Sequence, residues 1–328
     1  MSFLQSARVR AKGARKRLVF PESGDERTLS AAKAIAAEGM AEPILVVDPE
    51  RPGDHEAAAA TGVATVNPAS DPRRERVAAH LLERRKRKGL AASEAARLAT
   101  TPLYFADGLV ALGEADGCVA GAVHTTGDVM RAALWTVGVA PGVTTVSSAF
   151  YMVVPPFRIE EEEVLTFADC AVIPYPTARQ LADIALASAA DRIRIVGDLP
   201  RVAMLSFSSV GSGDGPSVAL VREALALVRA DAPELLVDGE LQGDAALIAR
   251  VGERKAPGSV VAGRANVLIF PSLDAGNISY KLVERLAHAH AVGPIVQGLA
   301  RPCSDLSRGA SSDDIINVAA ITALQATA

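Results

Sequence analysis

Cysteine is scarce in this chain, with three among 328 residues, at positions 118, 170 and 303. Their number is odd and their spacing is unlike the short intervals of zinc ligands, which argues against a disulfide framework and a thiolate metal site. Sparse, unpaired cysteine is typical of proteins from a reducing compartment. We therefore expect a cytoplasmic protein without structural disulfides or a metal.

Long apolar runs and an excess of basic charge are also missing. Hydrophobic residues make up 49% of the chain and the mean hydropathy is +0.22, but no run reaches the roughly 18 to 20 residues of a transmembrane helix. The basic N-terminal stretch is followed by no long apolar segment or small-residue cleavage site. A net charge of −4 and a pI of about 5.8 argue against nucleic acid or a membrane as the main partner.

Short apolar, β-rich runs alternate with Ala-rich helical segments along almost the whole chain. The run "RLVFPE" precedes the helical "ERTLSAAKAIAAEG", and "VAMLSFSS" precedes "PSVALVREALALVRA". This alternation predicts an α/β fold in which helices cover both faces of a parallel sheet. The length favours two domains, and the Pro/Gly-punctuated segment 139–148 is the best boundary.

A glycine-rich loop, "SSVGSGDGP" (208–216), lies between a predicted strand and a helix that starts with Pro216. Ser209, Gly211 and Ser212 are candidates for holding a phosphate at the free N–H groups of a helix N-terminus. The glycine spacing is G-x-G-x-G and not the G-x-G-x-x-G of dinucleotide-binding proteins, although Asp238 follows a later strand. A purely steric role for these glycines is an equally good interpretation.

The segment "HTTGDVMR" (124–131) follows a strand of small residues and opens a predicted helix. Thr126 or Asp128 can cap this helix, which is the structural interpretation of both. Arg131 is harder to explain structurally, because a cation near a helix N-terminus opposes the helix dipole. A bound anion would account for it.

Two further segments are candidates for substrate contacts. The basic run 84–88, which includes Arg85, is typical of a solvated helix end, but in an acidic chain it also suits the phosphates of a nucleotide. The segment 268–287 predicts a strand, a turn with Asn277 and then a helix with Lys281. Open α/β sheets place their ligands at such strand ends.

The segment "SDLSRGASSDD" (304–314) raises the same question, because it puts an arginine between hydroxyl residues just before an acidic helix start. Asp and Ser as helix caps are one interpretation; an anion docked beside a base is the other. The chain contains no G-x-S-x-G or H-E-x-x-H motif, which disfavours covalent or zinc chemistry.

Taken together, these segments resemble the phosphate acetyltransferase and phosphate butyryltransferase family. The match extends in order from about residue 18 to the end and includes "VFPESGDERTLSAA", "DGCVAGAVHTTGDVMRAAL", "PRVAMLSFSSVGSG", "VDGELQGDAAL" and "GPIVQGLARPCSDLSRGASSDDI". The resemblance implies two α/β/α domains with a cleft between them, as in isocitrate and isopropylmalate dehydrogenases. The first domain would comprise residues 1–143 and 297–328, and the second residues 144–296. Homodimers are usual in the family.

The resemblance also implies the reaction, which is reversible acetyl transfer between coenzyme A and phosphate with no metal or redox cofactor. By position in the motifs, Asp314 would be the base for the thiol and Ser307 the donor to the oxyanion. Arg308 and Arg131 would hold the phosphate and acyl groups. Contacts to coenzyme A or phosphate are expected from Arg85, Thr126, Ser209, Gly211, Ser212, Asn277 and Lys281.

Three alternatives stay open at this point. A propanoyl or butyryl preference is compatible with the same motifs, since one methylene changes discrimination by only about 1 to 3 kcal/mol. A dehydrogenase on a related fold would use the glycine loop and Asp238. A catalytically silent regulatory copy is the third.

Overall fold

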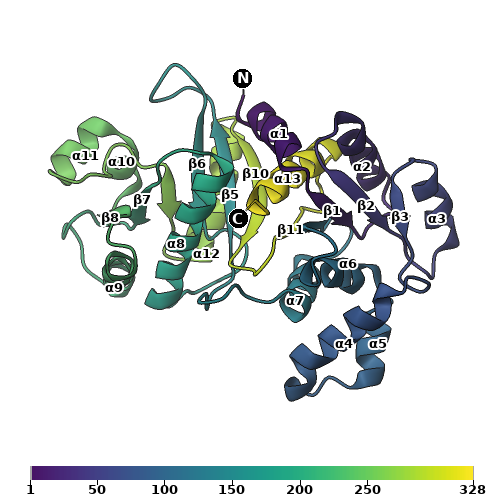
Figure 1. The fold of residues 1–328 in the computed structure, drawn as a ribbon. Coiled ribbons are helices and arrows are strands. Elements are labelled where there is room, and N and C mark those ends of the chain that lie inside the picture. Colours follow the sequence, from purple (N-terminus) through teal and green to yellow (C-terminus); the bar gives the residue numbers. More distant parts are fainter. Residues whose placement is uncertain (1, 328) are drawn as a thin grey trace. The chain divides into compact units, whose positions relative to one another are not determined.

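The computed structural model describes residues 2–327 and has an α/β architecture. The chain forms two compact units (Figure 1). Unit 1 comprises residues 3–141 and the return segment from 299 onward, and unit 2 comprises 142–298. Each unit contains its own sheet with helices on both faces.

The sheet of unit 1 has five strands in the order β11-β4-β1-β2-β3, and every neighbouring pair is parallel. In this register Val19 of the central strand lies opposite both Ile44 and Cys118. The strands are β1 (Arg17–Phe20), β2 (Glu42–Val46), β3 (Ala64–Val66), β4 (Gly117–Ala120) and β11 (Cys303–Asp305). The last strand comes from the return segment and completes the edge beside β4.

Helices cover both faces of this sheet (Figure 1). One face packs against α1 (Phe3–Ala14), α2 (Glu26–Glu38) and α13 (Ser312–Gln325). The other face and its surroundings carry α4 (Arg73–Arg85), the short 3₁₀ turn η1 (Lys86–Lys88), α5 (Ala92–Leu98), α6 (Pro102–Ala111) and α7 (Thr126–Thr136). Helix α3 (Pro52–Ala59) contacts β3. Apolar residues of β1 and β4 are buried on both sides, which explains their uninterrupted apolar sequence.

The sheet of unit 2 has six strands in the order β10-β5-β6-β9-β7-β8 and is mixed, not purely parallel as the βα alternation predicts. The pairs β10–β5 and β5–β6 are antiparallel, and the other three pairs are parallel. The strands are β5 (Ser147–Val154), β6 (Glu163–Ala168), β7 (Arg201–Leu205), β8 (Leu236–Leu241), β9 (Val267–Ile269) and β10 (His290–Gln297). The acidic residues 160–163 lie at the end of the connection between β5 and β6, and the last of them is the first residue of β6.

On the faces of this second sheet, α8 (Ala178–Ile195) and α9 (Pro216–Asp231) pack against each other, and α10 (Gly243–Leu247), α11 (Ala249–Lys255) and α12 (Leu273–Leu286) complete the unit. Helix α12 begins several residues earlier than the sequence suggests. Ser272 caps it by accepting from the Ala275 N–H, so Asn277 lies within the helix and not in a turn. Gly276 allows this, since a Cβ there would lie 2.2 Å from the carbonyl oxygen of Asp169.

No helix within residues 2–327 is long and apolar enough to cross a membrane.

Candidate active site

Three neighbouring strands of unit 1, β11, β4 and β1, end at the same edge of the parallel sheet. The loops that leave them are residues 21–25, 121–125 and 306–311. Because the carboxyl ends of adjacent parallel strands meet, these loops lie together and form the usual ligand-binding edge of an α/β sheet. The predicted residues Thr126, Ser307 and Arg308 lie in or directly beside them.

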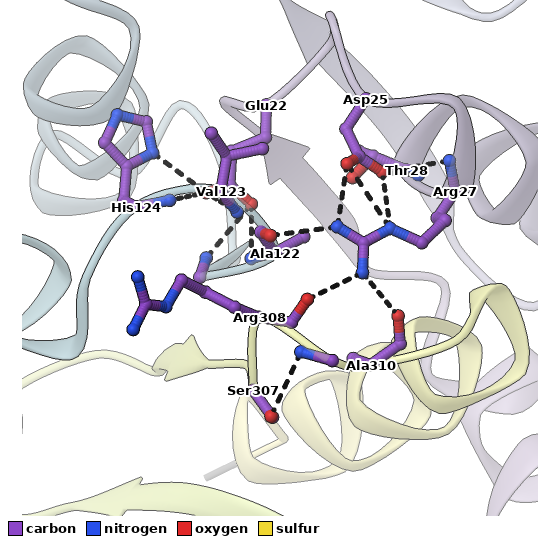
Figure 2. A network of polar contacts seen from close by, with 12 residues as sticks. Glu22, Asp25, Arg27, Thr28, Ala122, Val123, His124, Ser307, Arg308 and Ala310 are labelled. Carbon is purple, nitrogen blue, oxygen red and sulfur yellow. Dashed lines mark hydrogen bonds and ion pairs between the residues drawn. The ribbon is translucent and has the colours of Figure 1, made fainter.

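The loop after β11 carries Ser307 and Arg308, both exposed. The Ser307 hydroxyl accepts a hydrogen bond from the Gly309 N–H at 3.2 Å, which leaves its own proton available to donate. Among residues 2–327 the guanidinium of Arg308 has no hydrogen-bond or ion-pair partner, while its carbonyl oxygen is bound by Arg27 (Figure 2). A fixed main chain with an unneutralised guanidinium is suited to binding an anion.

Asp314 begins the helix that follows this loop. Its Oδ2 accepts from both the N–H and the hydroxyl of Ser311, and its own N–H donates to the Ser311 hydroxyl. This is a capping box at the start of α13. Asp314 therefore caps α13, as the structural interpretation expects. If Asp314 also acts as a base, the carboxylate that takes the proton is the same one that caps the helix.

The loop after β4 is organised by Glu22, which our sequence interpretation did not include. The buried carboxylate of Glu22 accepts four main-chain N–H groups, from residues 121 to 124, at 2.8 to 3.0 Å (Figure 2). It also accepts from Nδ1 of His124 at 2.8 Å. Burial alone would raise the pKa of Glu22, but the hydrogen bonds from His124 and the main chain outweigh it and lower that pKa, and the pKa of His124 is raised in return by Glu22.

Asp25 and Arg27 were also not among the candidate residues from the sequence. Asp25 caps α2 by accepting from the N–H groups of Arg27 and Thr28. The guanidinium of Arg27 reaches across to both neighbouring loops (Figure 2). The signal for these residues was present, since "PESGDER" is a polar stretch directly after a buried strand, which is where α/β sheets place functional groups.

The helix after the 121–125 loop, α7, is capped by Thr125 and not by Thr126 or Asp128. Asp128 accepts from the Thr125 hydroxyl at 2.7 Å and from Nη1 of Arg131 at 2.9 Å. The pair of Arg131 and Asp128 is about half exposed on both sides, so it contributes little to stability; within residues 2–327 the Arg131 guanidinium donates through Nη1 alone.

Arg85 lies at the end of α4 and stacks on α7. Its Cζ is 4.4 Å from the ring centroid of Trp135, a cation–π contact. Trp135 follows Arg131 by four residues, which places both on one face of α7, and both Arg85 and Arg131 act electrostatically on Tyr104. The structure therefore brings Arg85 and Arg131 to one surface of unit 1.

Beneath the loops, the carboxyl of Asp305 is almost fully buried at the end of β11. Burial raises its pKa to about 6. Gly121 approaches it so closely that a Cβ would lie 2.4 Å from Oδ1 of Asp305 and 2.5 Å from the N–H nitrogen of Leu306. This contact joins the ends of β4 and β11.

In unit 2 the loop 208–213 holds Ser209, Gly211 and Ser212 together. Its main-chain N–H groups are used within the loop and by β8: Gly211 donates to Glu240 at 2.9 Å, and Ser209 to the Ser212 hydroxyl at 2.9 Å. Arg222 lowers the pKa of Glu240 to about 2. The free N–H groups that the glycines suggest are thus already occupied at these positions, and the loop offers side chains and exposed Val210 instead.

Asn277 and Lys281 lie one turn apart on α12. The Asn277 amide donates to the Cys170 carbonyl oxygen at 2.9 Å, which is a structural contact. Lys281 is exposed, with Nζ 5.6 Å from the ring centroid of Tyr280. Asp238, the acid that would hold a ribose in a dehydrogenase, instead pairs with Arg229 at 2.9 Å.

Within residues 2–327 no group of three or more His, Cys, Asp or Glu side chains is arranged to hold a metal ion.

Comparison with known proteins gives a consistent result. Residues 2–323 match the family model described as phosphate acetyl/butaryl transferase. A phosphate acetyltransferase from Thermoanaerobacterium thermosaccharolyticum is 46% identical over 99% of this chain and all of its own length.

Solved structures agree. A phosphotransacetylase from Streptococcus pyogenes is 39% identical, covers this chain completely and 99% of its own, and superposes with a TM-score of 0.91. A structure from Salmonella typhimurium, provisionally assigned as a 4-hydroxythreonine-4-phosphate dehydrogenase, is 12% identical with a TM-score of 0.55, covers 94% of this chain and 99% of its own, and shares the fold alone.

Proposed function

Because this chain belongs to the phosphate acetyl/butaryl transferase family, we propose that it catalyses the reversible transfer of an acetyl group between coenzyme A and inorganic phosphate. Acetyl-CoA and phosphate would give acetyl phosphate and CoA. The observation that supports this most directly is the exposed guanidinium of Arg308, which has no counterion in residues 2–327 and lies on the same loop as Ser307.

We propose the following roles in the direction that forms the thioester. The Asp314 carboxylate takes the proton of the CoA thiol, and the thiolate attacks the carbonyl carbon of acetyl phosphate. The carbonyl oxygen becomes an oxyanion, to which the Ser307 hydroxyl donates. When the intermediate collapses, the bond between carbon and the phosphate oxygen breaks, and phosphate leaves with Arg308 and Arg131 neutralising its charge. No covalent enzyme intermediate or cofactor takes part.

For coenzyme A, we propose that Arg85 contacts its phosphates. The guanidinium of Arg85 is held over Trp135 on the surface that also carries Arg131, which supports a polyanion site there. Thr126 lies at the same helix start. From unit 2, the side chains of Ser209 and Ser212 and the ammonium of Lys281 are the proposed contacts, whereas the main-chain N–H of Gly211 is engaged by Glu240.

A thiol-release assay tests the proposal. The purified protein is incubated with acetyl-, propanoyl- and butyryl-CoA, each with phosphate or with arsenate, and free thiol is measured. We expect phosphate-dependent thiol release, highest with acetyl-CoA. Absence of release from all three would reject acyl transfer, and a higher kcat/KM with butyryl-CoA would replace acetyl by the longer acyl group.

For its cellular state, we propose a cytoplasmic homodimer. The exposed apolar residues Ile278, Leu282 and Leu286 form a stripe on α12, spaced by four residues and 52 to 77% exposed. Such a stripe beside the edge strand β10 supports self-association. A dehydrogenase is not supported, because Asp238 is paired with Arg229.

A further inference from the structure

Arg27 connects the two loops that flank the proposed phosphate site. Its Nη1 donates to the carbonyl oxygens of Arg308 at 2.9 Å and of Ala310 at 2.8 Å, and its Nη2 donates to the carbonyl oxygen of Ala122 at 2.9 Å (Figure 2). One side chain thus holds both the loop after β11 and the loop after β4.

The remaining N–H groups of Arg27 are taken by Asp25, with Nε to Oδ1 at 3.0 Å and Nη2 to Oδ2 at 2.8 Å. A guanidinium has five N–H groups, and each of these five is directed at an oxygen of the protein. None is left for a substrate, so any effect of Arg27 on the reaction must pass through the main chain that it holds.

Helix formation does not explain this arginine. It lies in the first turn of α2, where a cation opposes the helix dipole, and the helix is already capped by the Asp25 carboxylate. Arg73 provides a comparison at the start of α4. It forks onto Asp71 in the same way, at 2.8 and 2.6 Å, but its guanidinium binds no main-chain carbonyl among residues 2–327.

The loop that receives Ala122 is itself fixed, because the buried Glu22 carboxylate accepts its four N–H groups. In the loop of Ser307 and Arg308, residues 307–309 are exposed, and side chains bind two of the loop's N–H groups, those of Gly309 and Ser311. Arg27 therefore ties a weakly held loop to a firmly held one.

From this geometry we propose that Arg27 is a positioning residue for acyl transfer: by holding the carbonyl oxygens of residues 308 and 310 against that of Ala122, it fixes the direction of the Arg308 side chain toward the phosphate. The proposal rests on the proposed function. A displacement of about 1 Å in a positioning group can cost roughly 100-fold in rate, so loss of the Arg27 contacts is expected to affect catalysis more than folding.

Kinetics of Arg27→Lys and Arg27→Ala test the proposal, with Arg73→Ala as the matched control. Lysine keeps the charge beside Asp25 but cannot reproduce the planar fork. We expect kcat/KM for phosphate to fall by about 10- to 100-fold in both Arg27 variants, while KM for acetyl-CoA changes by less than about twofold. Guanidinium ion added to Arg27→Ala is expected to restore part of the loss. Arg73→Ala loses the same type of local ion pair and should retain the wild-type constants.

A purely structural role predicts a different pattern, in which both kinetic constants and the melting temperature fall together and Arg73→Ala behaves like Arg27→Ala. That pattern, or an Arg27→Lys variant with wild-type kcat/KM for phosphate, would overturn the proposal.

Amide hydrogen exchange separates this result from a failure of the proposed function. Exchange in residues 304–311 should be faster in Arg27→Lys than in wild type or Arg73→Ala, whether or not acyl-CoA is turned over. Unchanged exchange in residues 304–311 would reject the positioning role of Arg27. Faster exchange there in a protein that releases no thiol would reject only acyl transfer.

Discussion

Arg308 places a positive charge on an exposed loop with no carboxylate beside it in residues 2–327. If the guanidinium neutralises phosphate in the transition state, Arg308→Ala should lower kcat/KM for phosphate by about 100-fold or more and leave the melting temperature nearly unchanged. Thiol release at varied phosphate concentration measures the loss.

Arg301→Ala is the control for that variant, because Arg301 is an exposed arginine on the same return segment, before β11. It removes one positive charge without touching the loop after β11. Equal rates for Arg308→Ala and Arg301→Ala would show that the phosphate binds elsewhere.

Asp107 is a buried acid that the proposed chemistry does not use. It lies on α6 beside the thiols of Cys118 and Cys303, two residues that lie opposite each other on the neighbouring strands β4 and β11. Burial raises its pKa to about 7. Between its ordinary pKa and about 7, the folded state holds a proton that the unfolded state has lost, so stability falls as the pH rises through this range.

Asp107→Asn removes this titration with little change in side-chain volume. Relative to wild type, the variant should be more stable at pH 8 than at pH 5 by about 3 kcal/mol, since about two pH units of the pKa difference fall between these two pH values and each unit corresponds to about 1.4 kcal/mol. Urea unfolding of both proteins at the two pH values measures the difference. A stability difference independent of pH would mean that Asp107 does not ionise over this range in the folded protein.

Some residues of the site were recognisable from the sequence and others were not. Ser307 and Arg308 lie in an unusual sequence motif, and the structure places them at the carboxyl edge of a parallel sheet. Glu22 and Arg27 act on loops about 100 and 280 residues away along the chain, and nothing in their local sequence specifies those partners. Only the strand order β11-β4-β1 brings them together.

At the level of elements, the close approach of β4 to β11 depends on Gly121. A Cβ at this position would lie 2.5 and 2.7 Å from the main-chain nitrogen and oxygen of Leu306, and its φ of +110° is strained for other residues. Gly121→Ala should therefore destabilise unit 1 by about 2 kcal/mol or more and lower activity, because Leu306 directly precedes Ser307. Thermal unfolding and the thiol assay measure the two effects.

Gly13→Ala is the matched control for Gly121→Ala. Gly13 lies in α1, and an added Cβ would meet nothing within 4 Å. Alanine in a helix is favoured over glycine by about 1 kcal/mol, so this variant should be at least as stable as wild type. A Gly121→Ala protein with the same stability and activity would contradict the tight contact.

The elements themselves were largely predictable, because apolar runs and Ala-rich segments have different periods. The α/β class follows from their alternation. What the pattern did not specify is pairing direction: the apolar sequence of β5 is equally compatible with parallel and antiparallel neighbours, and the structure pairs it antiparallel with both β6 and β10. The start of α12 was misplaced because Gly276 and Asn277 favour turns locally, whereas packing against Asp169 and Cys170 overrides that preference.

For the whole molecule, the apolar stripe on α12 leads to a test of self-association. Leu282→Glu puts a charge at the centre of this stripe, and burying an unpaired charge is costly. We expect wild type to have the mass of two chains by light scattering after size exclusion, and Leu282→Glu to have the mass of one.

The control is Ile193→Glu on α8, where Ile193 is 56% exposed, similar to Leu282 at 52%. This variant should keep the mass of wild type. A monomeric wild-type protein would contradict the homodimer, and a dimeric Leu282→Glu would place the interface on another surface.

The return of the chain to unit 1 after residue 298 has a consequence for how the protein is made. On the ribosome, β1 to β4 leave the exit tunnel before unit 2, whereas β11 and α13 are synthesised after the whole of unit 2. Nascent unit 1 therefore waits with one sheet edge unpaired and without the loop that carries Ser307 and Arg308, and domains otherwise tend to fold in the order of their synthesis. Unit 2 can therefore fold before unit 1 is complete, and the loop of Ser307 and Arg308 can take its place in unit 1 only after the return segment has been synthesised.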